Sequence, residues 1–130
     1  MNVRTGFVTQ MGMSHETALD AAADYGFDFV ELMMDGTGER TQLDARADEI
    51  RSSLAARDLD LLVHLPFGGI DLGSPFEHVR QGSVRELAAA IDTAADLDAE
   101  KAVVHPTTNA WSAGWDAADL RANVVDSLRT

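Results

Sequence analysis

Two short apolar runs in this chain each end on a histidine that is followed closely by a proline. They are Leu61-Leu62-Val63-His64-Leu65-Pro66 and Ala102-Val103-Val104-His105-Pro106. Each run is too short for a helix, and proline cannot continue a central strand, so each predicts a buried parallel strand with its histidine at the carboxyl end. Because α/β folds keep their chemistry at that end of the strands, the two histidines are the first candidates for a site.

Length and charge limit the kinds of protein this can be. The 130 residues are 45% hydrophobic, which is enough for the core of one domain. Acidic residues outnumber Lys and Arg by 22 to 10, and the formal net charge is −12. Such a surface repels phosphate backbones and anionic lipids, so we expect neither a nucleic-acid nor a membrane partner.

The kinds of charged residue point to a salty environment. The acids are mostly aspartate, and Lys101 is the single lysine among the basic residues. Aspartate excess with few lysines suggests adaptation to high salt, where screening shortens the Debye length to ~3 Å near 1 M and weakens self-repulsion. We therefore expect a halophilic source.

Cysteine usage and the hydropathy pattern bear on the compartment. The chain has no cysteine, which excludes disulfides, thiolate zinc sites and thiol nucleophiles. Its start lacks a basic segment followed by an apolar one, and no apolar run approaches the ~20 residues that span a bilayer. We expect a cytoplasmic protein.

Stretches with the hydrophobic period of a strand alternate along the chain with stretches that have the period of a helix. This alternation predicts four strand-helix units in one domain, residues 1–130. We expect strands at 4–10 and 29–33 and strands that carry His64 and end at His105. The expected helix caps are Ser14, with Gly26 ending that helix, then Ser74 followed by Pro75 at the first helical position, and finally Asp116. Such alternation implies right-handed crossovers and a parallel sheet, which is an α/β fold.

Three side chains on the predicted strands could carry chemistry. His64 and His105 end consecutive strands, so their imidazoles could converge on one metal ion. Glu31 lies inside an apolar strand, where burial of an ionised carboxylate is energetically unfavourable unless the group is paired or bound to a metal. It is a candidate metal ligand, substrate acceptor or proton-transfer group, and the alternative is an ion pair with Arg4 on the first strand.

Other candidates lie in loops and helix starts. His15 and His78 fall in first turns of helices beside acidic residues, and we expect both to be solvated surface groups. Backbone donors of the Asp-Gly-Thr-Gly loop at 35–38 could hold an anion, but without a Walker or dinucleotide pattern a turn is the better interpretation. Trp111 and Trp115 could form an apolar lid over a ligand, and equally they could pack under their loop or face a partner.

Three ordered motifs resemble the xylose isomerase-like TIM-barrel superfamily. They are ADYGFDFVEL at 23–32, VHLPF with IDLGSP at 63–67 and 70–75, and VVHP at 103–106. Within the superfamily the resemblance is to the sugar phosphate isomerase/epimerase group, and more distantly to endonuclease IV. The resemblance covers nearly the whole chain.

This resemblance implies a divalent metal ion, such as zinc, manganese or magnesium, at the carboxyl-terminal mouth of a TIM barrel. It implies His64 and His105 as metal ligands, and Glu31 as a catalytic candidate whose role varies within the group. The substrate would be a small sugar or sugar phosphate. Trp111 and Trp115 are the candidate substrate contacts because of their position in the loop and not because of the resemblance. The reaction would be a proton or hydride shift next to a carbonyl.

Since a (β/α)₈ barrel takes ~250 residues, four units resemble its amino-terminal half. The family's isomerases also use carboxylates from the fifth strand onward, which four units do not supply. We therefore expect a homo-oligomer, in which two copies close a barrel, or pairing with a missing carboxyl-terminal half. The alternatives to a sugar isomerase or epimerase are an endonuclease IV-like phosphodiesterase, which the acidic surface disfavours, and a non-catalytic half-barrel assembly module.

Overall fold

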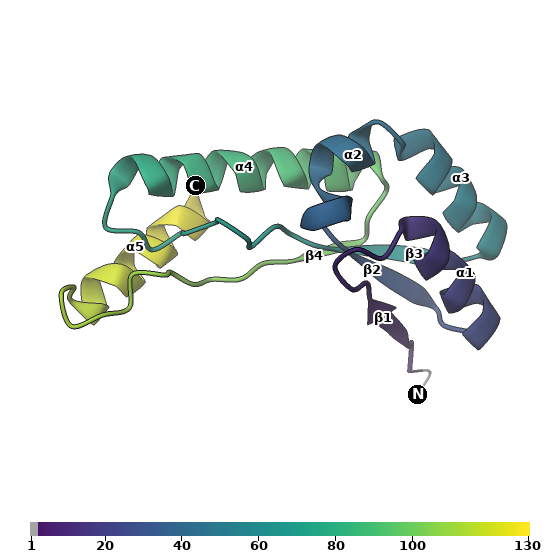
Figure 1. The fold of residues 1–130 in the computed structure, drawn as a ribbon, viewed down its shortest axis with the longest axis horizontal. Coiled ribbons are helices and arrows are strands. Elements are labelled where there is room, and N and C mark those ends of the chain that lie inside the picture. The colour runs from purple at the N-terminus through teal and green to yellow at the C-terminus, as the bar shows by residue number, and fades with distance from the viewer. Residues whose placement is uncertain (1–2) are drawn as a thin grey trace.

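The structure is a computed structural model that describes residues 3–130. Four parallel strands form one sheet in the order β1-β2-β3-β4 (Figure 1). The strands are β1 (Gly6–Val8), β2 (Phe29–Met33), β3 (Asp60–His64) and β4 (Lys101–Val103). The helices are α1 (His15–Tyr25), α2 (Arg40–Asp44), α3 (Ala47–Arg57), α4 (Glu77–Asp96) and α5 (Ala117–Arg129), with a 3-10 turn η1 at Gly36–Gly38. The predicted α/β fold with four strand-helix units is confirmed.

Strand order follows chain order, and every pairing is parallel. Met33 lies opposite His64, and His64 lies opposite Val103. The carboxyl ends of the strands therefore meet at one end of the sheet, as they do at the mouth of a barrel. Among residues 3–130, β1 and β4 have a strand on one side only, so the sheet has two open edges.

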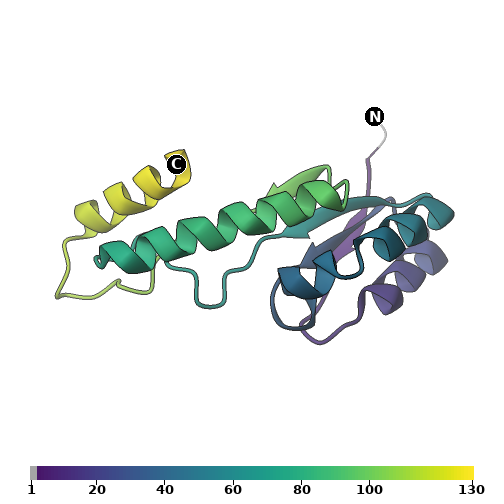
Figure 2. The same ribbon diagram turned by 90° about the horizontal axis from the view of Figure 1, so that it is seen from above.

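The helices cover one face of the sheet and build the core there. Figures 1 and 2 show α1 to α4 along one side of the strands, with α5 beside α4 and away from them. Alternate residues of β2 and β3 are 0% to 3% exposed beneath these helices: Val30, Leu32, Leu61 and Val63. The intervening Glu31, Leu62 and His64 are only partly buried. Because parallel sheets are ordinarily covered on both faces, this second face is the surface that the rest of a barrel would cover.

The ends of α1 lie where the sequence predicts. The Ser14 hydroxyl accepts the N–H of Thr17 at 3.2 Å. Gly26 ends the helix with a φ of +70°, a left-handed conformation that favours glycine. Asp116 caps α5 as predicted, because its Oδ1 accepts two backbone N–H groups of the first turn.

Other element ends differ from the prediction. The predicted start of α4 at Pro75 is wrong, because the helix begins at Glu77. The hydroxyl of Ser74 accepts the N–H of Phe76 and its carbonyl accepts Nη1 of Arg80, so this serine forms a turn ahead of the helix and does not cap it. Strands β1 and β4 are shorter than predicted. Among residues 3–130, no helix is long and apolar enough to cross a membrane.

Candidate functional site

His64 and His105 face each other at the carboxyl ends of β3 and β4. Their Nε2 atoms lie 2.6 Å apart, at hydrogen-bond distance, so one ring nitrogen donates and the other accepts. His64 is the last residue of β3, whereas His105 lies just beyond the end of β4 at Val103. The prediction that the two histidines lie on adjacent parallel strands and face one mouth is confirmed, with His105 in the loop and not in the strand.

Glu31 lies behind His64. Its Oε1 is 2.6 Å from Nδ1 of His64, and the two side chains are 18% and 16% exposed. A carboxylate on Nδ1 keeps the proton on that nitrogen and directs the Nε2 lone pair outward. The alternative partner for Glu31, Arg4, is wrong, since Arg4 pairs with Asp60 and Glu100 at the opposite ends of the strands.

Phe67 supports both imidazoles from the loop after β3. Its ring stacks on His105, with centroids 4.7 Å apart and planes at 17°, and it meets His64 edge-on at 5.7 Å. The Asp35 carboxylate accepts the backbone N–H groups of Phe67 at 3.0 Å and of Gly68 at 3.1 Å. This aspartate therefore holds the loop that places the phenylalanine against the histidines.

The sequence points to the loop at 35–38 for its backbone donors, whereas the structure shows that the side chain of Asp35 belongs to the site. Its loop forms the 3-10 turn η1, as the turn interpretation predicts, and its carboxylate binds backbone of the next loop along the sheet. A side chain at Gly68 would place a Cβ 2.8 Å from Oδ1 of Asp35, so it would displace this carboxylate. The signal in the sequence was the aspartate that closely follows an apolar strand.

The Nε2 atoms of His64 and His105 are suitable metal ligands in kind, but not in their separation or number. Two nitrogen ligands at ~2.0–2.1 Å from one tetrahedral zinc ion are ~3.4 Å apart, so the pair would have to open by about 0.8 Å. Glu31 does not join the histidines as a third ligand, since the one cluster of three ligating side chains among residues 3–130 lies elsewhere. The chain thus offers two oriented imidazole nitrogens, and a catalytic zinc ion normally has three protein ligands.

The two tryptophans lie away from the histidines. The segment between β4 and α5 leaves the sheet and runs beside the segment that precedes α4 (Figures 1 and 2). Trp115 meets Phe76 edge-on at 5.8 Å, and Trp111 lies 5.8 Å from the guanidinium carbon of Arg121. Both indoles remain nearly half exposed, and their role as substrate contacts stays a prediction.

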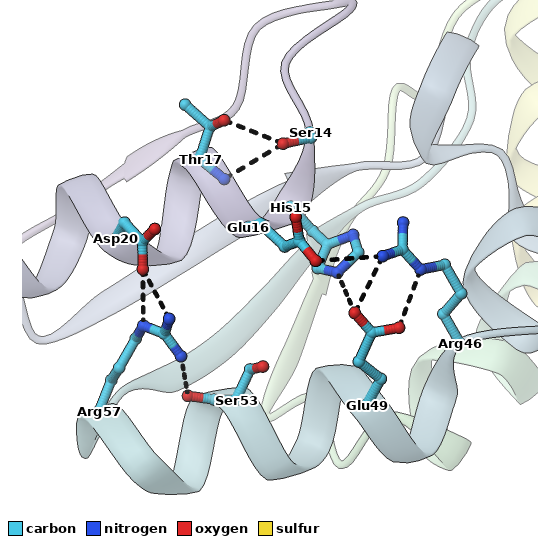
Figure 3. A network of polar contacts seen from close by, with 9 residues as sticks. All are labelled: Ser14, His15, Glu16, Thr17, Asp20, Arg46, Glu49, Ser53 and Arg57. Atoms are coloured by element: carbon cyan, nitrogen blue, oxygen red, sulfur yellow. Dashed lines mark hydrogen bonds and ion pairs between the residues drawn. The ribbon is translucent and has the colours of Figure 1, made fainter.

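The expectation of a solvated surface position for His15 is wrong, whereas His78 is exposed as expected. His15 is 8% exposed, between the starts of α1 and α3 (Figure 3). The helical period could have predicted this burial. His15 lies three, four and seven residues before the buried face of α1, which consists of Ala18, Leu19 and Ala22.

Comparisons with known proteins agree with the fold. Residues 19–130 match the family described as xylose isomerase-like TIM barrel. An uncharacterized protein of Methanocaldococcus jannaschii is 30% identical over 93 residues, which are 69% of this chain and 30% of that protein. A D-tagatose 3-epimerase-like protein of known structure has a TM-score of 0.78 and 24% identity, over 95% of this chain and 46% of its own.

Two further solved structures have the same fold. A D-psicose 3-epimerase from Clostridium cellulolyticum, solved with D-tagatose, has a TM-score of 0.76 and 17% identity, over 98% of this chain and 46% of its own. Endonuclease IV from Thermus thermophilus has a TM-score of 0.65 and 20% identity, over 98% and 46%. The chain thus spans about half the length of these solved proteins and less than a third of the archaeal one.

Proposed function

Since this chain belongs to the xylose isomerase-like TIM barrel family, we propose that it is the amino-terminal half of a metal-dependent sugar or sugar phosphate isomerase or epimerase. The observation that carries the proposal is the pair of Nε2 atoms of His64 and His105, which lie 2.6 Å apart at the carboxyl ends of neighbouring strands. That is the end at which barrels of this type bind their ligands.

Four residues have a part in this proposal. His64 and His105 would hold a divalent ion through Nε2, and the chemistry such an ion would supply there is Lewis-acid polarisation of sugar oxygens. Glu31 is a positioning residue, because it acts through the Nδ1–H of His64 and not on the substrate. Phe67 keeps the ring of His105 in place by stacking.

The proposed reaction needs groups beyond these strands. Two histidines leave a catalytic ion short of the usual three protein ligands, and a shift next to a carbonyl also needs a positioned acid-base group. The face of the sheet that bears Glu31 and His64 is partly open, and both sheet edges are free among residues 3–130. A second copy or a carboxyl-terminal half would supply the missing strands.

A second candidate function is phosphodiester cleavage of the endonuclease IV kind, which the likeness to a solved endonuclease IV favours. The net charge of −12 argues against it, because DNA binding draws most of its affinity from Lys and Arg contacts to phosphates. A third candidate is a half-barrel that serves only in assembly and binds no metal at His64 and His105.

The test of the proposed function is metal stoichiometry followed by activity. We expect His64→Ala and His105→Ala each to lose one equivalent of bound Zn²⁺ or Mn²⁺, measured by calorimetry. The control His78→Ala, an exposed histidine of α4, should keep it. Unchanged binding in both site variants would overturn the proposal and favour the assembly module. Assays with sugar phosphates and with abasic-site DNA then separate the two enzymatic candidates.

A further inference from the structure

A second group of metal-ligating side chains lies at the starts of α1 and α3. Figure 3 shows His15 and Glu16 of α1 directed toward Glu49 of α3. One ligating atom from each of these three residues lies within 4.8 Å of the other two. None of the three belongs to the His64–His105 pair, so the group is a separate feature of the molecule.

The imidazole of His15 is buried and lacks a partner at one nitrogen. Its side chain is 7% exposed, and among residues 3–130 its Nε2 has no hydrogen-bond partner. Oε1 of Glu49 faces this nitrogen at 3.7 Å, which is beyond hydrogen-bond distance. Folded proteins seldom leave a buried polar atom unsatisfied, so this nitrogen calls for an explanation.

The spacing of Nε2 of His15 and Oε1 of Glu49 suits an ion between these two atoms. Two ligands at ~2.0–2.1 Å from a zinc-sized ion are ~3.4 Å apart at the tetrahedral angle and at most ~4.2 Å apart. The observed 3.7 Å lies between these limits. We propose that His15, Glu16 and Glu49 bind a divalent transition-metal ion such as Zn²⁺, which ties the start of α1 to the start of α3.

Arg46 is the cation that an incoming metal ion would replace. Its Nη2 donates to Oε1 of Glu49 at 2.9 Å and to Oε1 of Glu16 at 3.3 Å. The Arg46 side chain is 44% exposed, so it can turn into solvent without losing a buried position. Two carboxylates against one guanidinium leave the group with a net negative charge, which favours a further cation.

The side chains of Glu16 and Glu49 are 61% and 47% exposed, and a hollow of about 490 Å³ opens beside the group. His15 and Arg46 both line it, together with Ser14 and Thr37 from the loops at the carboxyl ends of β1 and β2. An ion can therefore enter without unfolding of either helix, which a usable metal site requires. The bound ion would connect the start of α1 to the start of α3, near the mouth of the half-barrel.

The test uses the 130-residue chain with His64→Ala and His105→Ala, which removes the first pair of ligands. We expect calorimetry with Zn²⁺ to measure one remaining equivalent. Glu49→Gln should weaken its binding at least about tenfold through loss of a ligand. The control Asp48→Asn, a neighbour whose side chain is 95% exposed, should leave it unchanged.

Arg46→Gln should change the Zn²⁺ affinity in the opposite direction from Glu49→Gln. Removal of the competing guanidinium should tighten Zn²⁺ binding about two- to fivefold, the range for one exposed ion pair. Nitrogen-detected NMR of the imidazoles should show a metal-induced shift at Nε2 of His15 and none at His78. No bound equivalent in this background, or equal affinity in Glu49→Gln and Asp48→Asn, would overturn the proposal. Because the background lacks both strand-end histidines, neither outcome bears on the proposed function.

Discussion

Oε1 of Glu31 lies 2.6 Å from Nδ1 of His64, while Nε2 of the same imidazole lies 2.6 Å from Nε2 of His105. The carboxylate thus reaches the candidate metal position only through the ring of His64. Strand register explains the arrangement, because Glu31 lies opposite Leu62 and both Glu31 and His64 project from the partly open face of the sheet.

Replacement of Glu31 tests whether its carboxylate positions the imidazole of His64. We expect Glu31→Gln to lower metal affinity about 10- to 100-fold, because an amide holds the Nδ1–H of His64 more weakly and no longer sets its tautomer. Calorimetry gives the affinity, and imidazole NMR should report a mixed tautomer at His64. Full affinity with an unchanged tautomer would show that the carboxylate has no positioning role.

The isolated chain should self-associate. Apolar side chains of α4, α5 and the segments after β3 and β4 line an open groove of about 450 Å³, and Ile91 and Leu128 there are about half exposed. The outer edge of β4 is also free among residues 3–130. We expect a dimer by sedimentation in molar salt, and Val103→Lys should weaken it by placing a charge on this edge. A compact monomer throughout would contradict this prediction.

Turnover should depend on the missing strands. We expect the purified 130-residue chain to isomerise sugar phosphates very slowly or not at all, because its two histidines leave the metal short of ligands and Glu31 acts only through His64. Addition of a carboxyl-terminal half-barrel in trans should raise the rate in a coupled assay. Rapid turnover by the 130-residue chain alone would show that two strand-end histidines suffice.

Two glycine substitutions should have opposite effects on stability. Gly68→Ala places a Cβ 2.8 Å from Oδ1 of Asp35, so the carboxylate must move and its bonds to the loop weaken. We expect a loss of about 1 kcal/mol in the free energy of unfolding. Gly82→Ala, in α4 with no atom closer than 4.0 Å to the added Cβ, should stabilise the chain by roughly 0.5–1 kcal/mol. Urea unfolding of both variants measures whether the free energy of unfolding falls in Gly68→Ala and rises in Gly82→Ala.

The start of α2 should weaken in acid. The Thr41 hydroxyl donates a hydrogen bond to Glu39 and lowers the pKa of that carboxyl. A lowered folded-state pKa means that this contribution is present above the unfolded pKa and is lost as pH falls through the folded value. We expect the carbonyl-detected NMR titration of Glu39 to lie below the usual glutamate range, and Thr41→Val to raise the pKa of Glu39 toward that range.

The sequence predicts those features that depend on neighbouring residues. The apolar run at Phe29–Met33 became β2 with the same bounds, and the caps Ser14 and Asp116 begin α1 and α5. The predicted cap at Ser74 failed because a nearby side chain takes one of the atoms that a cap uses. The carbonyl of Ser74 is taken by the side chain of Arg80, so the apparent cap before α4 is a turn.

The sequence by itself determined the order of strands and helices, the parallel α/β class and the placement of two histidines at strand ends, because hydrophobic period and caps are local properties. Only the tertiary structure decided that Glu31 pairs with His64 and not with Arg4, and that His15 is buried against α3. These contacts join residues far apart in the chain, so they depend on strand register and helix packing. Register and packing follow from burial of the whole core, which no single stretch of sequence specifies.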